Sequence, residues 1–264
     1  MLLTFLNINA DITVKGSDTM VILGQRWAEK YMETHPDVKI SIIGGGSGIG
    51  LAALQNNQTD ICNASRKIKT KEIAGCIKSF GNKPTEYKVA LDGLSVYLNE
   101  KNPVKKLSLN QLGGIFSGKI TNWKEVGGND AEIIVYSREN SSGTYEFFKE
   151  HVLKGKDFYS KAQTMPGTAV VIQAVSNEIN GIGYGGAAYA STVTMCAVSE
   201  DDDGDAYLPT KENVINGKYP IWRHLYIYVN PKVDVGDVNS YINWILNSDG
   251  QSIVSEVGYY PIKQ

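Results

Sequence analysis

The sequence has few of the residues that build metal sites and disulfide frameworks. Its 264 residues include three cysteines and three histidines. The cysteines form no CxxC pair, the histidines are scattered, and neither set has the spacing of metal ligands. We therefore expect no metal, no cofactor and no disulfide framework. Cys62 and Cys76 could form a bridge in an oxidising compartment, but buried free thiols are the preferred interpretation.

Long apolar runs are absent as well. No stretch reaches the roughly 18 apolar residues that a membrane-spanning helix needs. Residues 1–10 are apolar but short, and they lack the basic start of a secretory signal. We interpret this segment as the remnant of such a signal, an added segment or a true first turn.

The sequence has no excess of either charge. Lys and Arg (26 residues) nearly balance Asp and Glu (28 residues), which gives a formal net charge of -2. This balance argues against nucleic acid or an acidic membrane surface as a partner. Any anion that the protein binds must be held by local dipoles and a few side chains.

Motifs of catalysis are incomplete. The spacing from Gly113 to Lys119 is that of a phosphate-binding P-loop, but Ile120 stands where a Ser or Thr must meet magnesium. Around Ser47, Ile49 takes the place of the second glycine of a nucleophile elbow. No base is evident, so we expect a binding protein and not an enzyme.

The most informative stretch is residues 137–148, SRENSSGTYEFF. It follows an apolar strand-like run at residues 133–136 and leads into a segment with apolar residues at helical spacing. A strand-to-helix turn of this kind exposes backbone N–H groups at a helix N-terminus, where the dipole favours an anion. The alternative is an ordinary N-cap at Ser141 or Ser142 with a solvated Arg138.

Two further helix starts carry hydroxyl groups. Residues 17–19 (SDT) follow the strand-like run 12–14, and the glycine-rich residues 44–48 (GGGSG) follow the run 38–43. Three such starts can converge on one ligand, which favours an anion cradle over isolated caps.

Strand-like and helix-like segments alternate along much of the chain, which predicts an α/β fold with a largely parallel sheet. Ligands of such sheets bind beyond the carboxyl ends of the strands. The strands expected are 12–14, 38–43, 60–64 and 181–186, and the helices expected are 19–34, 48–55, 71–80, 107–114, 169–176 and 238–246.

Two long apolar runs, residues 87–99 and 223–231, both carry Asn with Pro close behind near their ends. We interpret them as two crossings between lobes, which would form a hinge. One lobe then comprises residues 11–97 plus 225–264, and the other comprises residues 98–224. The alternative is that both runs are central strands of one sheet.

Four motifs together resemble the phosphate-binding proteins of bacterial ABC uptake systems, the PstS type. They are residues 16–19 (GSDT), 44–48 (GGGSG), 112–123 (LGGIFSGKITNW) and 138–144 (RENSSGT). The resemblance implies a two-lobed type II periplasmic-binding-protein fold, each lobe a mixed sheet flanked by helices. It also implies a monomeric periplasmic or extracytoplasmic receptor, lipid-anchored in some members, that closes on phosphate and delivers it to a membrane permease.

The resemblance carries over a set of phosphate ligands: Thr19, the N–H of Met20, Ser47, Arg138, Ser142, Gly143 and Thr144. The chain departs from part of the family at Ser65-Arg66, where an aspartate accepts the proton of HPO4. Either a second positive charge at Arg66 replaces that acceptor, or Asp92 or Asp18 has taken its role; Asp92 is preferred. The alternatives are a receptor for sulfate, arsenate or a phosphonate, and a phosphoryl-transfer enzyme.

Overall fold

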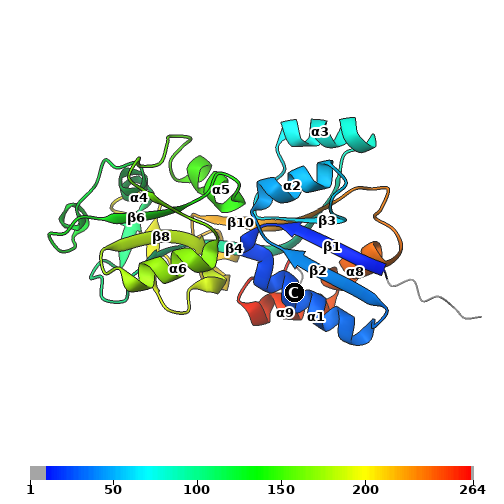
Figure 1. Cartoon of the computed structure of the whole chain (residues 1–264). Helices are drawn as coiled ribbons and strands as arrows, with labels where there is room; N and C mark the ends of the chain where they lie inside the picture. Colours follow the sequence, from blue (N-terminus) through cyan, green and yellow to red (C-terminus); the bar gives the residue numbers. More distant parts are fainter. Residues whose placement is uncertain (1–9, 263–264) are drawn as a thin grey trace, which may run out of the picture.

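The structure is a computed structural model that describes residues 10–262. The segment 1–10, apart from Ala10, lies outside the described residues. Figure 1 shows two groups of helices and strands side by side, with β4 (Thr85–Leu98) and β10 (Trp222–Val229) running between them. Among residues 10–262, no helix is both long and apolar enough to cross a membrane.

The first group contains both ends of the described chain. In it, α2 and α3 cover one face of the strands, and α1, α8 and α9 cover the other (Figure 1). Its elements are β1 (Ala10–Gly16), α1 (Val21–Thr34), β2 (Val38–Ile43), α2 (Ser47–Gln55), β3 (Ile61–Ala64), α3 (Thr70–Phe80), α8 (Gly236–Leu246) and α9 (Ser248–Val257).

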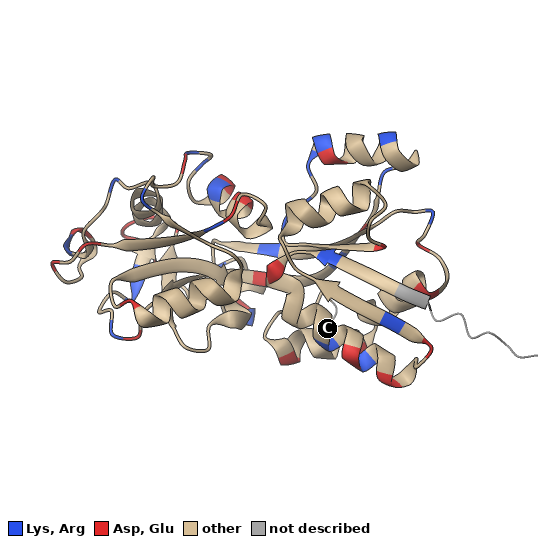
Figure 2. Ribbon diagram, in the orientation of Figure 1, with Lys and Arg blue, Asp and Glu red and all other residues tan. Residues whose placement is uncertain are grey.

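The second group is formed by the middle of the chain. Its elements are β5 (Lys106–Ser108), α4 (Leu109–Phe116), β6 (Ile134–Arg138), α5 (Gly143–His151), β7 (Gln163–Met165), α6 (Thr168–Asn177), β8 (Gly181–Gly186), β9 (Thr194–Ser199) and α7 (Lys211–Ile215). Lys and Arg are interspersed with Asp and Glu along the ribbon of both groups (Figure 2).

The strands join in the order β2-β1-β3-β10-β4-β8-β6-β7. β1 pairs in parallel with β2 and β3, and β6 pairs in parallel with β7 and β8. Between these parallel sets, β10 and β4 run antiparallel to each other and to their outer neighbours β3 and β8. The sheet is therefore mixed, and the carboxyl ends of β1, β3 and β6 are the strand ends at which the candidate site forms.

β4 is shared by the two groups. Its first part, up to Gly93, pairs with β10, and its last part, from Leu94, pairs with β8. The lobe boundaries at 97/98 and 224/225 stay a prediction, because they concern how the groups move.

Each group has its own apolar core. In the first group the helix α1 buries Leu23, Trp27 and Tyr31 on one face, as their helical spacing predicts. In the second group the rings of Phe116, Phe148 and Tyr184 pack together, and burial of each such side chain contributes roughly 1.5–3 kcal/mol. Separate cores allow each group to hold its part of the site rigidly.

Several local expectations need correction. The helix expected from Leu107 begins at Leu109, because Lys106–Ser108 forms β5 and Ser108 caps the helix with a 3.0 Å bond from the Gln111 N–H. The helix α9 was not predicted, since its first turn contains Gly250 and little apolar sequence. The cysteines are free and buried, which confirms free thiols and makes the bridge interpretation wrong.

Candidate anion-binding site

Three serine hydroxyls gather where β1 and β3 end. These strands are parallel neighbours with Gly16 opposite Asn63, so the residues that follow emerge at one edge of the sheet. Ser17 Oγ donates to Ser65 Oγ at 2.8 Å, and Ser47 Oγ accepts from the Ser65 N–H at 3.0 Å. All three serines are buried. The predicted site residues Ser47 and Ser65 are thus in direct contact.

The turn after β6 packs against these serines from the second group. A Cβ atom at Gly143 would lie 2.8 Å from Ser65 Oγ and would collide with Ser47 Oγ, so only glycine fits here. Next to it, Thr144 Oγ1 lies 2.8 Å from Thr19 Oγ1. The structure therefore brings together predicted residues that lie more than 100 positions apart in the chain.

The glycine-rich turn before α2 lets the two backbones approach. Gly48 N–H donates to Ser141 O at 2.9 Å. Gly46 has φ 96°, and a Cβ atom there would lie 2.6 Å from the same Ser141 oxygen. Any side chain at position 46 would be both strained and obstructed. The turn thus serves as a docking surface for residues 141–144.

Arg138 is 2% exposed, so the alternative of a solvated charge is wrong. Its Nη2 donates to Asp18 Oδ2 at 2.7 Å, and its Nη1 donates to Thr168 Oγ1 at 3.0 Å. Asp18 Oδ1 accepts in turn from the Gly45 N–H at 2.8 Å. This ion pair joins the two groups of elements beside the hydroxyl cluster, which is formed by Ser17, Thr19, Ser47, Ser65 and Thr144.

Ser142 is the N-cap of α5, and its Oγ accepts from the Tyr145 N–H at 3.3 Å. The cap uses an acceptor position of the hydroxyl and leaves its proton free to donate. The N–H groups of the first turn of α5, including those of Gly143 and Thr144, have no partner within the helix. Capping and anion binding are therefore compatible at this turn.

Met20 belongs to the site through its backbone alone. Its side chain is fully buried in the core of the first group, beside Leu23 and Trp27. Its N–H donates to Ser17 O at 3.0 Å, which closes the short 3-10 turn Asp18–Met20. An anion at this N–H would share it with that carbonyl.

Arg66 is not brought to the cluster. Its Nη1 and Nη2 donate to Glu72 at 2.9 and 2.7 Å, and Nη1 also donates to Lys67 O. Glu72 Oε2 also accepts from the Lys69 N–H at the start of α3. Burial pulls the pKa of Glu72 upward, but the bonds from Arg66 and Lys69 outweigh it and the pKa is lowered. The guanidinium of Arg66 therefore stabilises a helix start.

Asp92 is completely buried and reaches the cluster only through a residue that the sequence analysis missed. Its Oδ2 accepts from Arg223 Nε at 3.0 Å and Nη2 at 2.8 Å. Burial raises the pKa of Asp92 and Arg223 opposes the shift. Arg223 Nη2 also donates to Thr144 Oγ1 at 3.0 Å. Asp92 therefore pairs with Arg223, whereas Asp18, the other candidate proton acceptor, pairs with Arg138.

A signal for Arg223 was present in the sequence. Asp92 interrupts an apolar run, and a buried carboxylate requires a partner cation. The second apolar run begins with Arg223, and the two residues face each other across β4 and β10. The register between the strands, which the sequence did not give, was the missing step.

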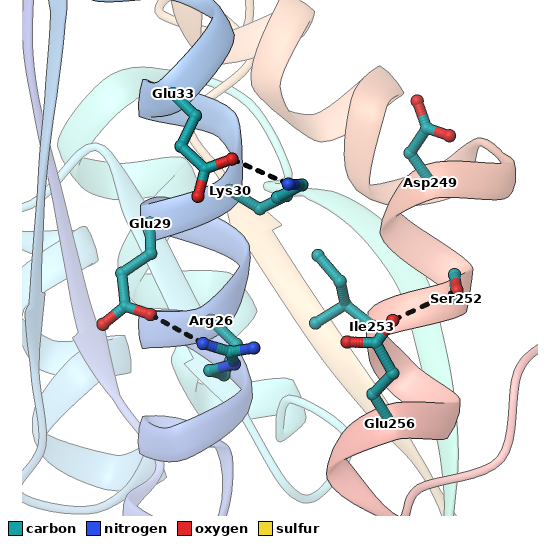
Figure 3. Close-up of a pocket in the computed structure, with 8 residues that line it drawn as sticks. All are labelled: Arg26, Glu29, Lys30, Glu33, Asp249, Ser252, Ile253 and Glu256. Carbon is teal, nitrogen blue, oxygen red and sulfur yellow. Dashed lines mark hydrogen bonds and ion pairs between the residues drawn. The ribbon is translucent and has the colours of Figure 1, made fainter.

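A separate groove of 310 Å³ lies between α1 and α9 (Figure 3). Its cations are neutralised on their own helix, since Arg26 pairs with Glu29 at 3.2 Å and Lys30 with Glu33 at 2.7 Å. Asp249 and Glu256 add further negative charge. The groove therefore offers an anion no favourable field.

Comparison with known proteins gives the class first. Residues 8–249 match the family model described as a PBP superfamily domain. The phosphate-binding protein PstS of Pseudomonas aeruginosa is 33% identical over 271 residues, covering 97% of this chain and 84% of the relative. PstS of Bacillus subtilis is 31% identical over 255 residues, covering 96% and 81%. The chain therefore belongs to the PstS family.

Solved structures agree. A Clostridium perfringens phosphate ABC transporter substrate-binding protein with bound phosphate superposes with a TM-score of 0.88 at 32% identity, covering 96% of this chain and 100% of that one. An ABC-type phosphate transport receptor from Vibrio cholerae gives 0.75 at 28% identity, covering 94% and 99%. The predicted family and the type II binding-protein fold are confirmed.

Proposed function

We propose that this protein binds inorganic phosphate at the hydroxyl cluster and delivers it to an ABC permease outside the cytoplasm. The observation that carries the proposal is the meeting of three helix starts around Arg138, Thr19 and Thr144. Its support from relatives is that proteins named for phosphate binding align over nearly the whole chain. The permease, the extracytoplasmic location and the role as a receptor instead of an enzyme rest on the family.

The proposed ligands would satisfy phosphate without adding net charge. A dianion taken out of water needs hydrogen bonds to nearly all its lone pairs. Hydroxyls and helix N-termini supply these as neutral donors, and Arg138 supplies a charged one whose charge Asp18 balances. The proposed set is Thr19, the Met20 N–H, Ser47, Ser65, Arg138, Ser142, Gly143 and Thr144; Arg66 and Asp92 are left out because their groups bond elsewhere.

We further propose that the two groups are lobes that close on the ion. Residues 11–97 plus 225–264 form one lobe, and residues 98–224 form the other. Thr19 and Ser47 come from one lobe, and Arg138 and Thr144 come from the other, so only the closed state engages both sets. We expect the protein to be a monomer. Small-angle scattering should show that it becomes more compact when phosphate is added after bound ligand has been removed. An unchanged radius of gyration would contradict closure.

Asp18 is the proposed acceptor for the proton of HPO4. Both its oxygens already accept one bond, and each carboxylate oxygen has a further lone pair. Sulfate brings no proton, so it would meet this carboxylate with an unmade bond, and such a mismatch can discriminate by about 10⁴–10⁵. Binding of another tetrahedral oxyanion is the alternative, because the aspartate found in part of the family is Arg66 here.

The carboxylate assignment predicts that Asp18→Asn shrinks the ratio of phosphate to sulfate affinity by at least about 100-fold. Asp92→Asn is the matched control, because the Asp92 carboxylate bonds to Arg223 and to none of the proposed ligands, so its loss should weaken the binding of both anions alike. Calorimetric titration of each variant with both anions measures the ratio. An unchanged ratio in Asp18→Asn would rule out the assignment.

The function itself is tested by calorimetry on the wild-type protein after removal of bound ligand. At pH 7, phosphate should bind one-to-one with high affinity, and sulfate should give no measurable heat. Comparable binding of both anions would make this a general oxyanion receptor. Turnover of a chromogenic phosphate ester would point to an enzyme.

A further inference from the structure

A buried ion pair lies between the two crossing strands, next to the candidate site. Asp92 on β4 and Arg223 on β10 are Cα partners in the antiparallel pairing, and they are 0% and 4% exposed. Removing two charges from water costs several kcal/mol per ion, so such a pair is weak support for stability alone. Stability alone therefore does not account for the pair.

The direction of one hydrogen bond suggests a functional role for the Asp92–Arg223 pair. A guanidinium group can only donate, so Thr144 Oγ1 must accept from Arg223 Nη2 at 3.0 Å. A hydroxyl has one proton and two lone pairs, and with a lone pair committed to Arg223 its proton is left to donate. Thr19 Oγ1, at 2.8 Å, is the partner of that hydroxyl in this structure.

Arg223 is itself held on two sides. Asp92 Oδ2 accepts from its Nε and Nη2, and the ring of Phe147 lies 5.5 Å from its guanidinium carbon. Phe147 and Thr144 belong to the same helix, α5. The guanidinium thus connects a crossing strand to the helix start that carries the proposed ligands.

We infer that Arg223 is a positioning residue for anion binding: it fixes Thr144 as a hydrogen-bond donor to the ion, and Asp92 holds Arg223 for that task. This inference rests on the proposed function, which it deepens. We expect Arg223 to act through the Thr144 hydroxyl and not through a bond of its own to the ion, although its buried Nη1 has no hydrogen-bond partner among residues 10–262. Removal of the Arg223 guanidinium or of the Thr144 hydroxyl should therefore weaken binding through loss of the same interaction with the ion.

A double-mutant cycle tests this. Arg223→Gln should weaken phosphate binding about 10- to 100-fold, the usual size of a charge-assisted hydrogen bond, and Thr144→Val should weaken it at least as much. The double variant should bind no more weakly than Thr144→Val alone, because the two changes remove one interaction. Arg223→Lys, which keeps a cationic donor, should recover part of the affinity. Arg26→Gln, on the exposed surface of α1, is the control and should leave affinity unchanged.

Affinities are measured by calorimetric titration with phosphate, after thermal unfolding has shown that each variant is folded. Effects of Arg223→Gln and Thr144→Val that multiply in the double variant would overturn the inference and indicate direct contact between Arg223 and the ion. Wild-type affinity in Arg223→Gln would also overturn it. If Arg223→Gln does not fold, Arg223→Lys with and without Thr144→Val gives the same cycle. Wild-type protein that binds no phosphate would instead reject the proposed function, and the inference with it.

Discussion

The dipeptide Ser-Arg occurs at the ends of two strands, and the two copies serve different purposes. Arg66 follows β3 and Arg138 ends β6; both are buried, and both donate to a carboxylate at 2.7 Å. The partner of Arg66 is Glu72, six residues further along the chain. The partner of Arg138 is Asp18, which lies 120 residues away in the other group of elements.

This difference decides what each arginine can do. A carboxylate partner within the next helix fixes the start of that helix, so the Arg66–Glu72 pair stabilises local structure. A partner across the interface between the groups places the charge where the three helix starts meet, so the Arg138 pair is part of the candidate site. We therefore expect a structural role for Arg66, whose carboxylate partner is close in sequence, and a binding role for Arg138, whose partner lies in the other group.

The largest effect should come from breaking the pair at the site. Arg138→Gln removes a charged donor and leaves Asp18 uncompensated beside the ion, so phosphate affinity should fall at least about 100-fold. Arg66→Gln is the matched control and should leave the affinity within about threefold. Titration calorimetry measures both. Equal losses of phosphate affinity in the two variants would contradict the different roles expected for the two arginines.

A smaller effect is expected on stability. Arg66→Gln leaves Glu72 partly buried without its cation, which should lower the free energy of unfolding by about 2–3 kcal/mol, somewhat less than for a fully buried pair. Urea unfolding of the ligand-free protein measures this change. A variant as stable as the wild type would mean that the pair contributes little to the start of α3.

The smallest effect concerns pH. Because the pKa of Glu72 is lowered in the folded state, its contribution to stability is full above its unfolded pKa of about 4.3 and is lost as the pH falls through the folded value. Glu72→Gln should therefore flatten the decline of unfolding free energy between about pH 5 and pH 3. Parallel pH profiles for variant and wild type would show that Glu72 is not responsible.

Much of the site followed from local sequence, because helix starts with hydroxyls and glycines are read from consecutive residues. The three helix starts that contain Thr19, Ser47 and Thr144 were predicted in this way and lie together, whereas the family resemblance selected these residues as ligands. Arg223 could not be placed, since its contact with Asp92 depends on the register of two strands far apart in sequence. The helix α7 was missed because its five residues are too few for a helical pattern, whereas β9 was missed although it is as long as the predicted β8.

The role of Arg66 could have been predicted more closely. Glu72 stands three residues after Lys69, at the position from which a side chain reaches back to the start of a helix. That local pattern offered Arg66 a partner before any ligand was considered.

The most direct test of this account is a crystal structure of the protein with phosphate bound. Arg138 should donate to the ion while keeping Asp18, the Thr144 hydroxyl should donate to the ion while accepting from Arg223, and Arg66 should remain on Glu72. A phosphate contacted by Arg66, with Glu72 released, would contradict the account.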